Sequence, residues 1–165
     1  MAITRIVIAT DGSETAQAAM AWTANLAHAL GAAVVAVHAL DLNRYYPVVM
    51  AAPTYVPIDF AELTAKAERD LTTVWVQPLR DAGVKFRTRV EEGRAAAVIL
   101  DVAAAEAADL IVMGSRGHGG FTELLMGSVA HQVTHHATTP VVVIPPAAAM
   151  ASRGTARAEP SFTAV

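Results

Sequence analysis

Five short apolar runs, separated by segments with helical spacing, constrain the fold of this chain more than any other feature. The runs read TRIVIAT (4–10), AVVAVHAL (33–40), KFRTRVE (85–91), DLIVM (109–113) and PVVVI (140–144). The first barely alternates between polar and apolar residues, as in strands buried on both faces, whereas the third alternates as in strands near a sheet edge. The order β-α-β-α-β-α-β-α-β predicts an α/β doubly wound fold, a parallel sheet with helices on both faces.

The segments between the runs carry helix start and stop signals. Ser13 is expected to cap the first helix, and Gly31 to close it in a left-handed conformation. Pro78 is expected to kink the second helix or end it early. The expected helices run from Ser13 to Leu30, from Asp59 to about Ala82, from Arg94 to Ala107 and from about Ser128 to Ala137.

Composition bounds the possible functions. The 165 residues are 54% hydrophobic, which suits one domain, and the net charge of −3 gives no reason to expect nucleic acid. The absence of cysteine excludes disulfides, thiolate metal sites and cysteine nucleophiles. No apolar run reaches the ~18 residues that span a bilayer, and the N-terminus lacks signal-peptide features. We therefore expect a cytoplasmic protein without a membrane segment.

The chain is expected to form one domain over residues 1–146. Residues 147–165 are mostly Ala, Pro, Ser and Thr, and we expect them to be a disordered tail. Residues 41–58 are a long irregular segment with three prolines and three tyrosines, and such loops are often functional. The tyrosines are compatible with a lid over a ligand, a partner surface or local packing.

A glycine-rich stretch, MGSRGHGGFTELLMGSVA, occupies residues 113–130. Gly114 and Gly117 directly follow the fourth run, and Gly127 precedes Ser128 where a helix is expected to begin. A helix N-terminus offers unpaired N–H groups to an anion, and glycine lets a phosphate chain approach the backbone. Ser128 is expected to add a hydroxyl hydrogen bond and to cap the helix.

The same stretch is neither a Walker A loop nor a dinucleotide fingerprint. No lysine precedes Ser128, and the dinucleotide motif belongs after the first strand. In this chain the first strand is followed by Asp11, whose carboxylate suits ribose hydroxyls or an adenine amine better than phosphate. Ligands of doubly wound sheets bind beyond the carboxyl ends of the strands, where Asp11 and the glycine-rich stretch both lie. Arg116 and His118 are expected to add charge near the outer phosphates.

This pattern resembles the universal stress protein family, whose nucleotide-binding members carry G-x2-G-x9-G-[ST]. Gly114, Gly117, Gly127 and Ser128 match that motif position by position. The opening IVIATDGSETA, the VHAL that ends the second run and the closing ATTPVVVIP are also similar to the family. The resemblance covers about residues 3–146.

The resemblance implies a Rossmann-like, adenine-nucleotide alpha-hydrolase-like fold with strand order 3-2-1-4-5 and an ATP site between the first and fourth strands. It implies a homodimer through the last strand, residues 140–144. A divalent ion such as Mg or Mn is expected to be held by the phosphates, and cyclic AMP stays open as an alternative ligand. The implied adenine and ribose contacts are Ala9, Thr10, Asp11, the backbone of Ala39, Met113 and Gly114. The implied phosphate contacts are Gly117, Gly127, Ser128 and the amides of Val129 and Ala130, with Ser115, Arg116 and His118 in the same stretch.

The implied function is a nucleotide-dependent stress-response or signalling regulator rather than an efficient enzyme, with an unknown protein partner. Phosphoryl transfer needs a placed nucleophile, charge stabilisers and metal ligands, whereas this motif supplies a cradle. Slow ATP hydrolysis or autophosphorylation, for example at Ser128, stays open. One alternative is an adenylyl-transfer or ATP pyrophosphatase enzyme, which is expected to carry an SGGxD-like loop where this chain has ATDGS. The other is a nucleotide-free interaction module. His131 and His135 have the spacing of a metal clasp, but exposed helix residues are the interpretation we favour.

Overall fold

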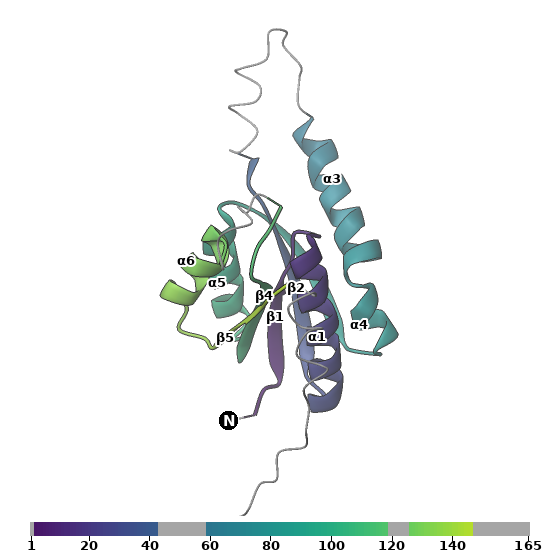
Figure 1. Ribbon diagram of the computed structural model, residues 1–165. Coiled ribbons are helices and arrows are strands. Elements are labelled where there is room, and N and C mark those ends of the chain that lie inside the picture. The colour runs from purple at the N-terminus through teal and green to yellow at the C-terminus, as the bar shows by residue number, and fades with distance from the viewer. Residues whose placement is uncertain (1, 43–58, 119–125, 147–165) are drawn as a thin grey trace, which may run out of the picture.

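The structure, a computed structural model, describes residues 2–42, 59–118 and 126–146. Within these residues, five parallel strands form one sheet in the order β3-β2-β1-β4-β5, with helices on both faces (Figure 1). The predicted α/β doubly wound fold and strand order are therefore confirmed. The strands are β1 Arg5–Ala9, β2 Ala33–Leu40, β3 Phe86–Glu92, β4 Leu110–Gly114 and β5 Val141–Ile144. The helices are α1 Glu14–Leu30, α3 Phe60–Asp70, the π-helical turn η2 Leu71–Trp75, α4 Gln77–Asp81, α5 Ala95–Ala105 and α6 Ser128–His136.

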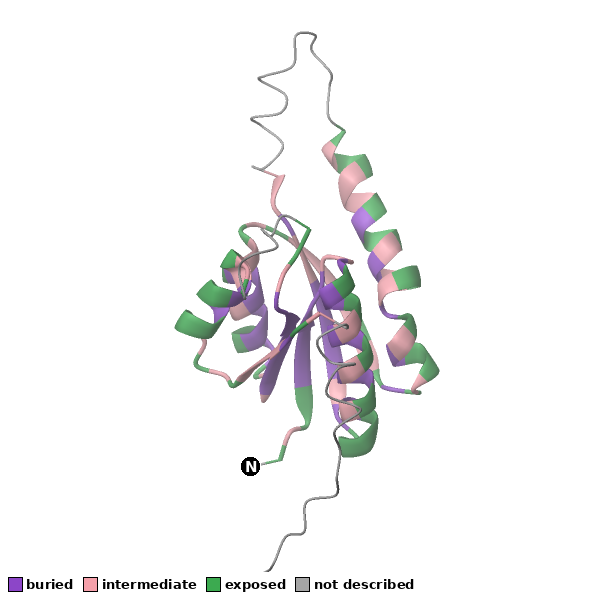
Figure 2. Cartoon of the chain, in the orientation of Figure 1, coloured by how far each residue is buried: buried purple, intermediate pink, exposed green. Residues whose placement is uncertain are grey.

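Two hydrophobic cores lie on opposite faces of the sheet. Successive side chains of a strand point to opposite faces, so Ile6 and Ile8 of β1 pack toward α1 and α4, whereas Val7 packs toward α5 and α6. All three side chains are completely buried, as Figure 2 shows for the strands in the middle of the molecule. Burial on both faces explains why the first run barely alternates.

Local signals set the limits of α1. Ser13 has extended backbone angles and its hydroxyl accepts a hydrogen bond from the Ala16 N–H at 3.4 Å. Gly31 ends the helix with φ of 66°, a left-handed conformation that costs glycine little. Both expected caps are confirmed.

The second helical segment is interrupted as expected, but by a π-helical turn rather than a simple kink. Asp59 caps α3 by accepting from the Glu62 N–H at 3.0 Å. The helix then widens over η2, and its regular geometry is lost at Val76, with φ of −88° and ψ of 5°. Pro78 lies in the first turn of α4, where its missing N–H costs nothing.

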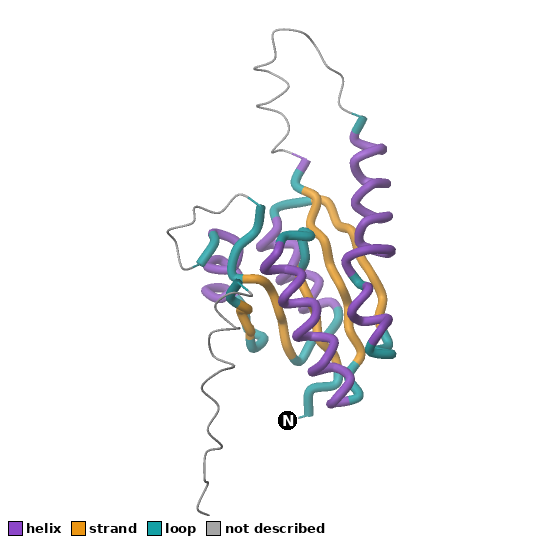
Figure 3. The backbone as a smooth tube through the Cα atoms, turned by 45° about the vertical axis from the view of Figure 1, so that its right-hand side comes forward, coloured by secondary structure: helices purple, strands orange, loops and turns teal. Residues whose placement is uncertain are grey.

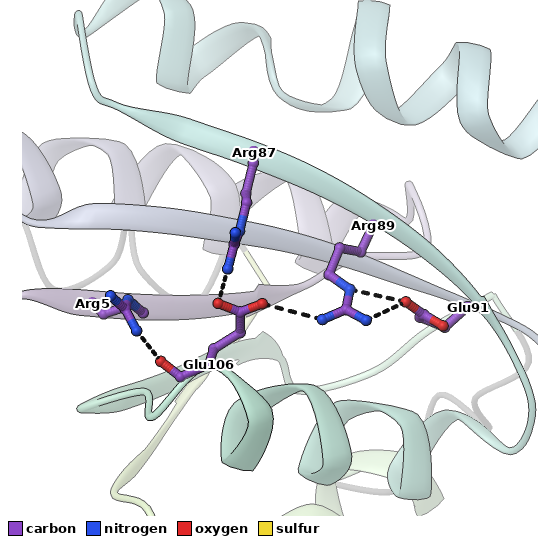
Figure 4. Close-up of polar contacts among 5 residues, drawn as sticks. All are labelled: Arg5, Arg87, Arg89, Glu91 and Glu106. Atoms are coloured by element: carbon purple, nitrogen blue, oxygen red, sulfur yellow. Dashed lines mark hydrogen bonds and ion pairs between the residues drawn. The ribbon is translucent and has the colours of Figure 1, made fainter.

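A charged cluster joins the edge strand β3 to the end of α5 (Figure 4). It consists of Arg5, Arg87, Arg89, Glu91 and Glu106. The Glu106 carboxylate pairs with Arg87 and, at 3.1 Å, with Arg89. Arg89 also pairs with Glu91 at 2.6 Å. Arg5 donates to the Glu106 carbonyl at the end of α5, where a cation opposes the negative end of the helix dipole.

The tyrosine-bearing segment 43–58 and the tail 147–165 lie outside the described residues, so the expectations for both stay predictions. Among the helices that the structure does describe, none combines the length and apolar character needed to cross a membrane.

Candidate functional site

The turns that follow β1 and β4 meet at the carboxyl edge of the sheet. Because all strands run in the same direction, these turns share one edge (Figure 3). The Asp11 carboxylate links them: its Oδ1 accepts from the Ser13 N–H at 3.0 Å and its Oδ2 from the His118 N–H at 3.2 Å. The His118 ring completes the link, with Nε2 3.0 Å from the Asp11 carbonyl oxygen. Two segments about a hundred residues apart therefore form one unit.

Two glycines of the motif fit closely against this unit. A Cβ at Gly117 would collide with Asp11 Oδ2, so the position beside Gly117 is filled by the carboxylate. A Cβ at Gly114 would lie 2.5 Å from Thr15 Oγ1 and 2.8 Å from the Thr15 carbonyl carbon. Packing against the start of α1 therefore gives Gly114 a reason to be glycine that does not depend on a ligand.

Hydroxyls at the start of α1 hold the backbone of the glycine turn. Thr15 donates a short hydrogen bond to the Arg116 carbonyl, and Ser13 Oγ lies 3.4 Å from the same oxygen. Sequence reasoning found Ser13 only as a helix cap and missed Thr15, because no local pattern marks a contact to a turn so distant in sequence.

The start of α6 forms the third side of the site. Gly127 is the N-cap, and its N–H donates to the Ser115 carbonyl at 2.7 Å. Ser128 is the first residue inside the helix, so the expectation that Ser128 caps α6 is wrong: the extended backbone that a cap needs belongs to Gly127. The first intrahelical bond runs from the His131 N–H to the Gly127 carbonyl at 3.0 Å, and within residues 2–42, 59–118 and 126–146 no side chain caps the helix. The N–H groups of residues 128–130 thus have no intrahelical acceptor.

A buried hydroxyl lies beside this helix start. Ser115 is only 4% exposed, and its Oγ has no hydrogen-bond partner among the described residues. Buried polar atoms without a partner are rare in folded proteins because they cost free energy, and a bound ion or water is one arrangement that removes this cost. Arg116 comes next in the chain, and its Cγ would lie 4.0 Å from a Cβ at Gly127.

The remaining predicted site residues lie at the same edge but differ in exposure. Ala9, Thr10, Met113 and Ala130 are buried, so their side chains are part of the packed interior. Val129 is half-buried and packs on the α5 face, so here the backbone amide is the group suited to a ligand. Ala39 lies near the end of β2, where it pairs in register with Glu91.

His38 and Trp75 support the turn after β1, and sequence reasoning did not connect either to the site. The His38 Nδ1 lies 2.8 Å from the Thr10 carbonyl, and the His38 and Trp75 rings meet edge to face with centroids 5.1 Å apart. Trp75 also lies against Gly12. No pattern in the sequence marks Trp75, which lies far along the chain from this turn.

The described part of the chain has no group of three or more His, Cys, Asp or Glu side chains that could hold a metal ion. His131 and His135 are exposed on α6 with stacked rings 6.2 Å apart, which agrees with the favoured interpretation of exposed helix residues.

The fold is that of a doubly wound α/β protein with a parallel sheet, a class in which ligands generally bind beyond the carboxyl ends of the strands. The model of the universal stress protein family matches residues 2–145. The chain therefore belongs to the universal stress protein family.

Known relatives agree with this assignment. Universal stress protein MJ0531 from Methanocaldococcus jannaschii is 33% identical over 85% of this chain and 81% of its own length. A universal stress protein from Mycolicibacterium smegmatis is 34% identical over 86% of this chain, but the match covers only 45% of that relative. The solved structure of hypothetical protein MJ0577 has a TM-score of 0.74 and 26% identity, covering 88% of this chain and 97% of the other.

Two more distant structures share the fold and contain a ligand. A universal stress protein in complex with cAMP has a TM-score of 0.60 and 21% identity, over 89% of this chain and all of the other. The universal stress protein from Archaeoglobus fulgidus in complex with dAMP has a TM-score of 0.63 and 23% identity, over 87% of this chain and 99% of the other.

Proposed function

We propose that this chain binds an adenine nucleotide, ATP in the first instance, at the edge where the turns after β1 and β4 meet. The observation that carries the proposal is the convergence of Asp11, the Gly117–His118 backbone and the start of α6 around the Ser115 hydroxyl, which has no partner in the described part of the chain. A carboxylate and a helix N-terminus in one site suit a ligand with hydroxyl or amine donors at one end and anionic groups at the other. The cAMP and dAMP complexes of the two more distant structures support an adenine nucleotide as that ligand.

Charge orients the nucleotide in this proposal. Asp11 repels phosphate and accepts hydrogen bonds, so the ribose or adenine lies on the β1 side with Ala9, Thr10 and Ala39. The N–H groups of Ser128 and its two successors, which have no acceptor within the helix, attract the phosphates toward α6.

The phosphate end has further candidate donors in Ser115, Arg116 and His118. Because Asp11 fills the position beside Gly117, we infer that the phosphates lie closer to Gly127 than to Gly117. A divalent ion such as Mg or Mn is held by the phosphates themselves. The bound ligand supplies charge and a rigid contact between the two turns, which favours a role as a nucleotide-dependent regulator over efficient catalysis.

Nucleotide identification tests the proposal most directly. Mass spectrometry of small molecules released from the purified, denatured protein is expected to detect an adenine nucleotide, and calorimetry with ATP, AMP and cAMP identifies the preferred one. No released nucleotide and no heat with any of the three would overturn the proposal. Fast turnover of ATP with a small acceptor would instead favour the adenylyl-transfer alternative.

Gly117→Val localises the site. The valine displaces Asp11 and obstructs the turn, so ATP affinity is expected to fall at least tenfold, a cost of about 1.4 kcal/mol. Ala29→Val is the matched control, because Ala29 is exposed near the far end of α1. Normal ATP binding by Gly117→Val would show that the glycine turn is not the cradle.

A further inference from the structure

Trp75 packs directly on the turn that carries Asp11. A Cβ placed on Gly12 would lie 2.5 Å from Trp75 Cε2 and 2.6 Å from Nε1, so the indole leaves room only for glycine. Gly12 also has φ of 78°, which L-residues with side chains rarely adopt. The turn and the indole therefore fix each other's position.

His38 extends this support to the residue before Asp11. The Thr10 carbonyl only accepts hydrogen bonds, so the His38 Nδ1 at 2.8 Å must donate to it. The Thr10 N–H donates to the Val37 carbonyl at 2.9 Å, so hydrogen bonds hold the peptide groups on both sides of Thr10. Because the Trp75 ring meets the His38 ring edge to face, one indole contacts both the Gly12 end and the Thr10 end of the turn.

The π-helical turn explains how Trp75 reaches this position. Leu71 and Val76 are both completely buried although they are five residues apart. Five residues turn an α-helix by a full turn plus ~140°, which would place the two side chains on different faces. The wider π-helical turn lets both enter the core and directs the intervening Trp75 toward Gly12.

We propose that Trp75 is a positioning residue for the nucleoside end of the site, an inference that rests on the proposed function. Asp11 lies between two residues whose backbones Trp75 supports, one directly and one through His38. Removal of the indole frees Gly12 to move, and the Asp11 carboxylate then loses its fixed orientation. The hydrogen bonds from Thr15 to the Arg116 carbonyl and from the Gly127 N–H to the Ser115 carbonyl do not involve Asp11, so the start of α6 keeps its position and the phosphate end is unaffected.

The test compares Trp75→Ala with Trp22→Ala. Both indoles pack on the same core, and Trp22 lies in the middle of α1, ten residues along the chain from Gly12. By calorimetry, Trp75→Ala is expected to weaken adenosine, AMP and ATP by the same factor, on the order of tenfold. Trp22→Ala is expected to bind all three like the wild type, with a similar loss of thermal stability. Trp75→Phe keeps an aromatic ring on Gly12 and is expected to restore part of the affinity.

Fluorescence gives a second readout. In Trp22→Phe the emission of Trp75 alone is expected to change on titration with AMP, whereas the emission of Trp22 in Trp75→Phe is not. Wild-type affinity of Trp75→Ala for all three ligands would overturn the inference, as would a loss confined to the phosphate-bearing ligands. Failure of the wild type to bind any of the three would overturn the proposed function itself.

Discussion

At the residue scale, Gly12 must be glycine for two reasons, its backbone conformation and its contact with Trp75, and the two contributions to stability can be measured separately. Its φ is positive, and a side chain there would meet the Trp75 ring. Gly31 has a similar φ of 66° but nothing within 4 Å of a Cβ, so Gly31→Ala measures the conformational cost alone, roughly 1 kcal/mol.

Gly12→Ala is expected to lower the free energy of unfolding by about 2 kcal/mol more than Gly31→Ala, because overpacking adds to the conformational cost. Urea denaturation measures both values. In a Trp75→Ala background, Gly12→Ala and Gly31→Ala should lower the free energy of unfolding by equal amounts. Equal costs in the wild-type background would contradict the contact between Gly12 and Trp75.

Asp109 joins the start of β1 to the start of β4. Its Oδ2 accepts from the Thr4 N–H at 2.8 Å, the Arg5 N–H at 2.9 Å and the Thr4 hydroxyl at 2.9 Å. The hydrogen bond from the Thr4 backbone, followed by that from Arg5, holds the pKa of Asp109 below its ordinary value of 3.8.

A lowered pKa in the folded state stabilises the fold above the ordinary pKa, and the contribution is lost as the pH falls through the lowered value. Asp109→Asn is therefore expected to lower the Tm at pH 7, and the difference from wild type should shrink below about pH 4. Thermal melts between pH 7 and pH 2.5 measure this. Asp101→Asn, at an exposed carboxylate on α5, is the control, and its Tm should equal that of the wild type both at pH 7 and below pH 4. A constant difference across this range would contradict the assignment.

At the scale of elements, the edge strand β3 combines apolar packing of Phe86 and Val90 with the charged cluster. The Glu106 side chain is 7% exposed and pairs with two arginines, whereas Glu91 is 39% exposed and pairs with one. Charges that point inward from an edge strand also oppose pairing with another chain.

Glu106→Gln is expected to cost on the order of 1–2 kcal/mol, less than a fully buried pair because Arg87 and Arg89 reach solvent. Glu91→Gln, with the same chemical change at an exposed position, should cost under about 0.5 kcal/mol. Urea denaturation distinguishes them. Equal small costs would mean that the cluster contributes nothing to stability.

The elements differ in how well the sequence predicted them, and the difference has a physical reason. Strand and helix positions depend on local apolar spacing, so runs such as TRIVIAT and the caps at Ser13 and Gly31 predict them well. The η2 turn depends on two core positions filled by Leu71 and Val76, which no local pattern requires. In the site, the glycine spacing identified the turn, but the roles of Thr15 and Trp75 depend on contacts between distant segments.

At the scale of the whole molecule, the two edges of the sheet differ. β3 carries the charged cluster, whereas β5 has three half-exposed valines. The Pro140 carbonyl accepts from the Ile111 N–H, and the Ile144 carbonyl accepts from the Ser115 N–H just after β4. In a parallel ladder alternate residues of a strand bond to the same neighbour, so the N–H of Val143 points to the outer edge of the sheet. We propose that β5 joins a second copy of the chain.

Val143→Pro removes that outer donor without removing a bond to β4, and is expected to convert a dimer into a monomer. Sedimentation or light scattering at matched concentration measures the mass, with circular dichroism to confirm the fold. A monomeric wild type, or a folded variant that stays dimeric, would contradict an interface at β5.

The strand order has a consequence for the way the chain is made. β1 is synthesised first but lies in the middle of the sheet, and its partner β4 begins only at Leu110. In a growing chain that ends before β4, one side of the central strand β1 is unpaired. Such a chain has Asp11 but neither the glycine turn nor α6. Because a ligand stabilises only the state that binds it, a nucleotide at this site can act only after α6 has been synthesised. Bound nucleotide would thus mark chains that have passed this point of synthesis and have paired β1 with both of its neighbours.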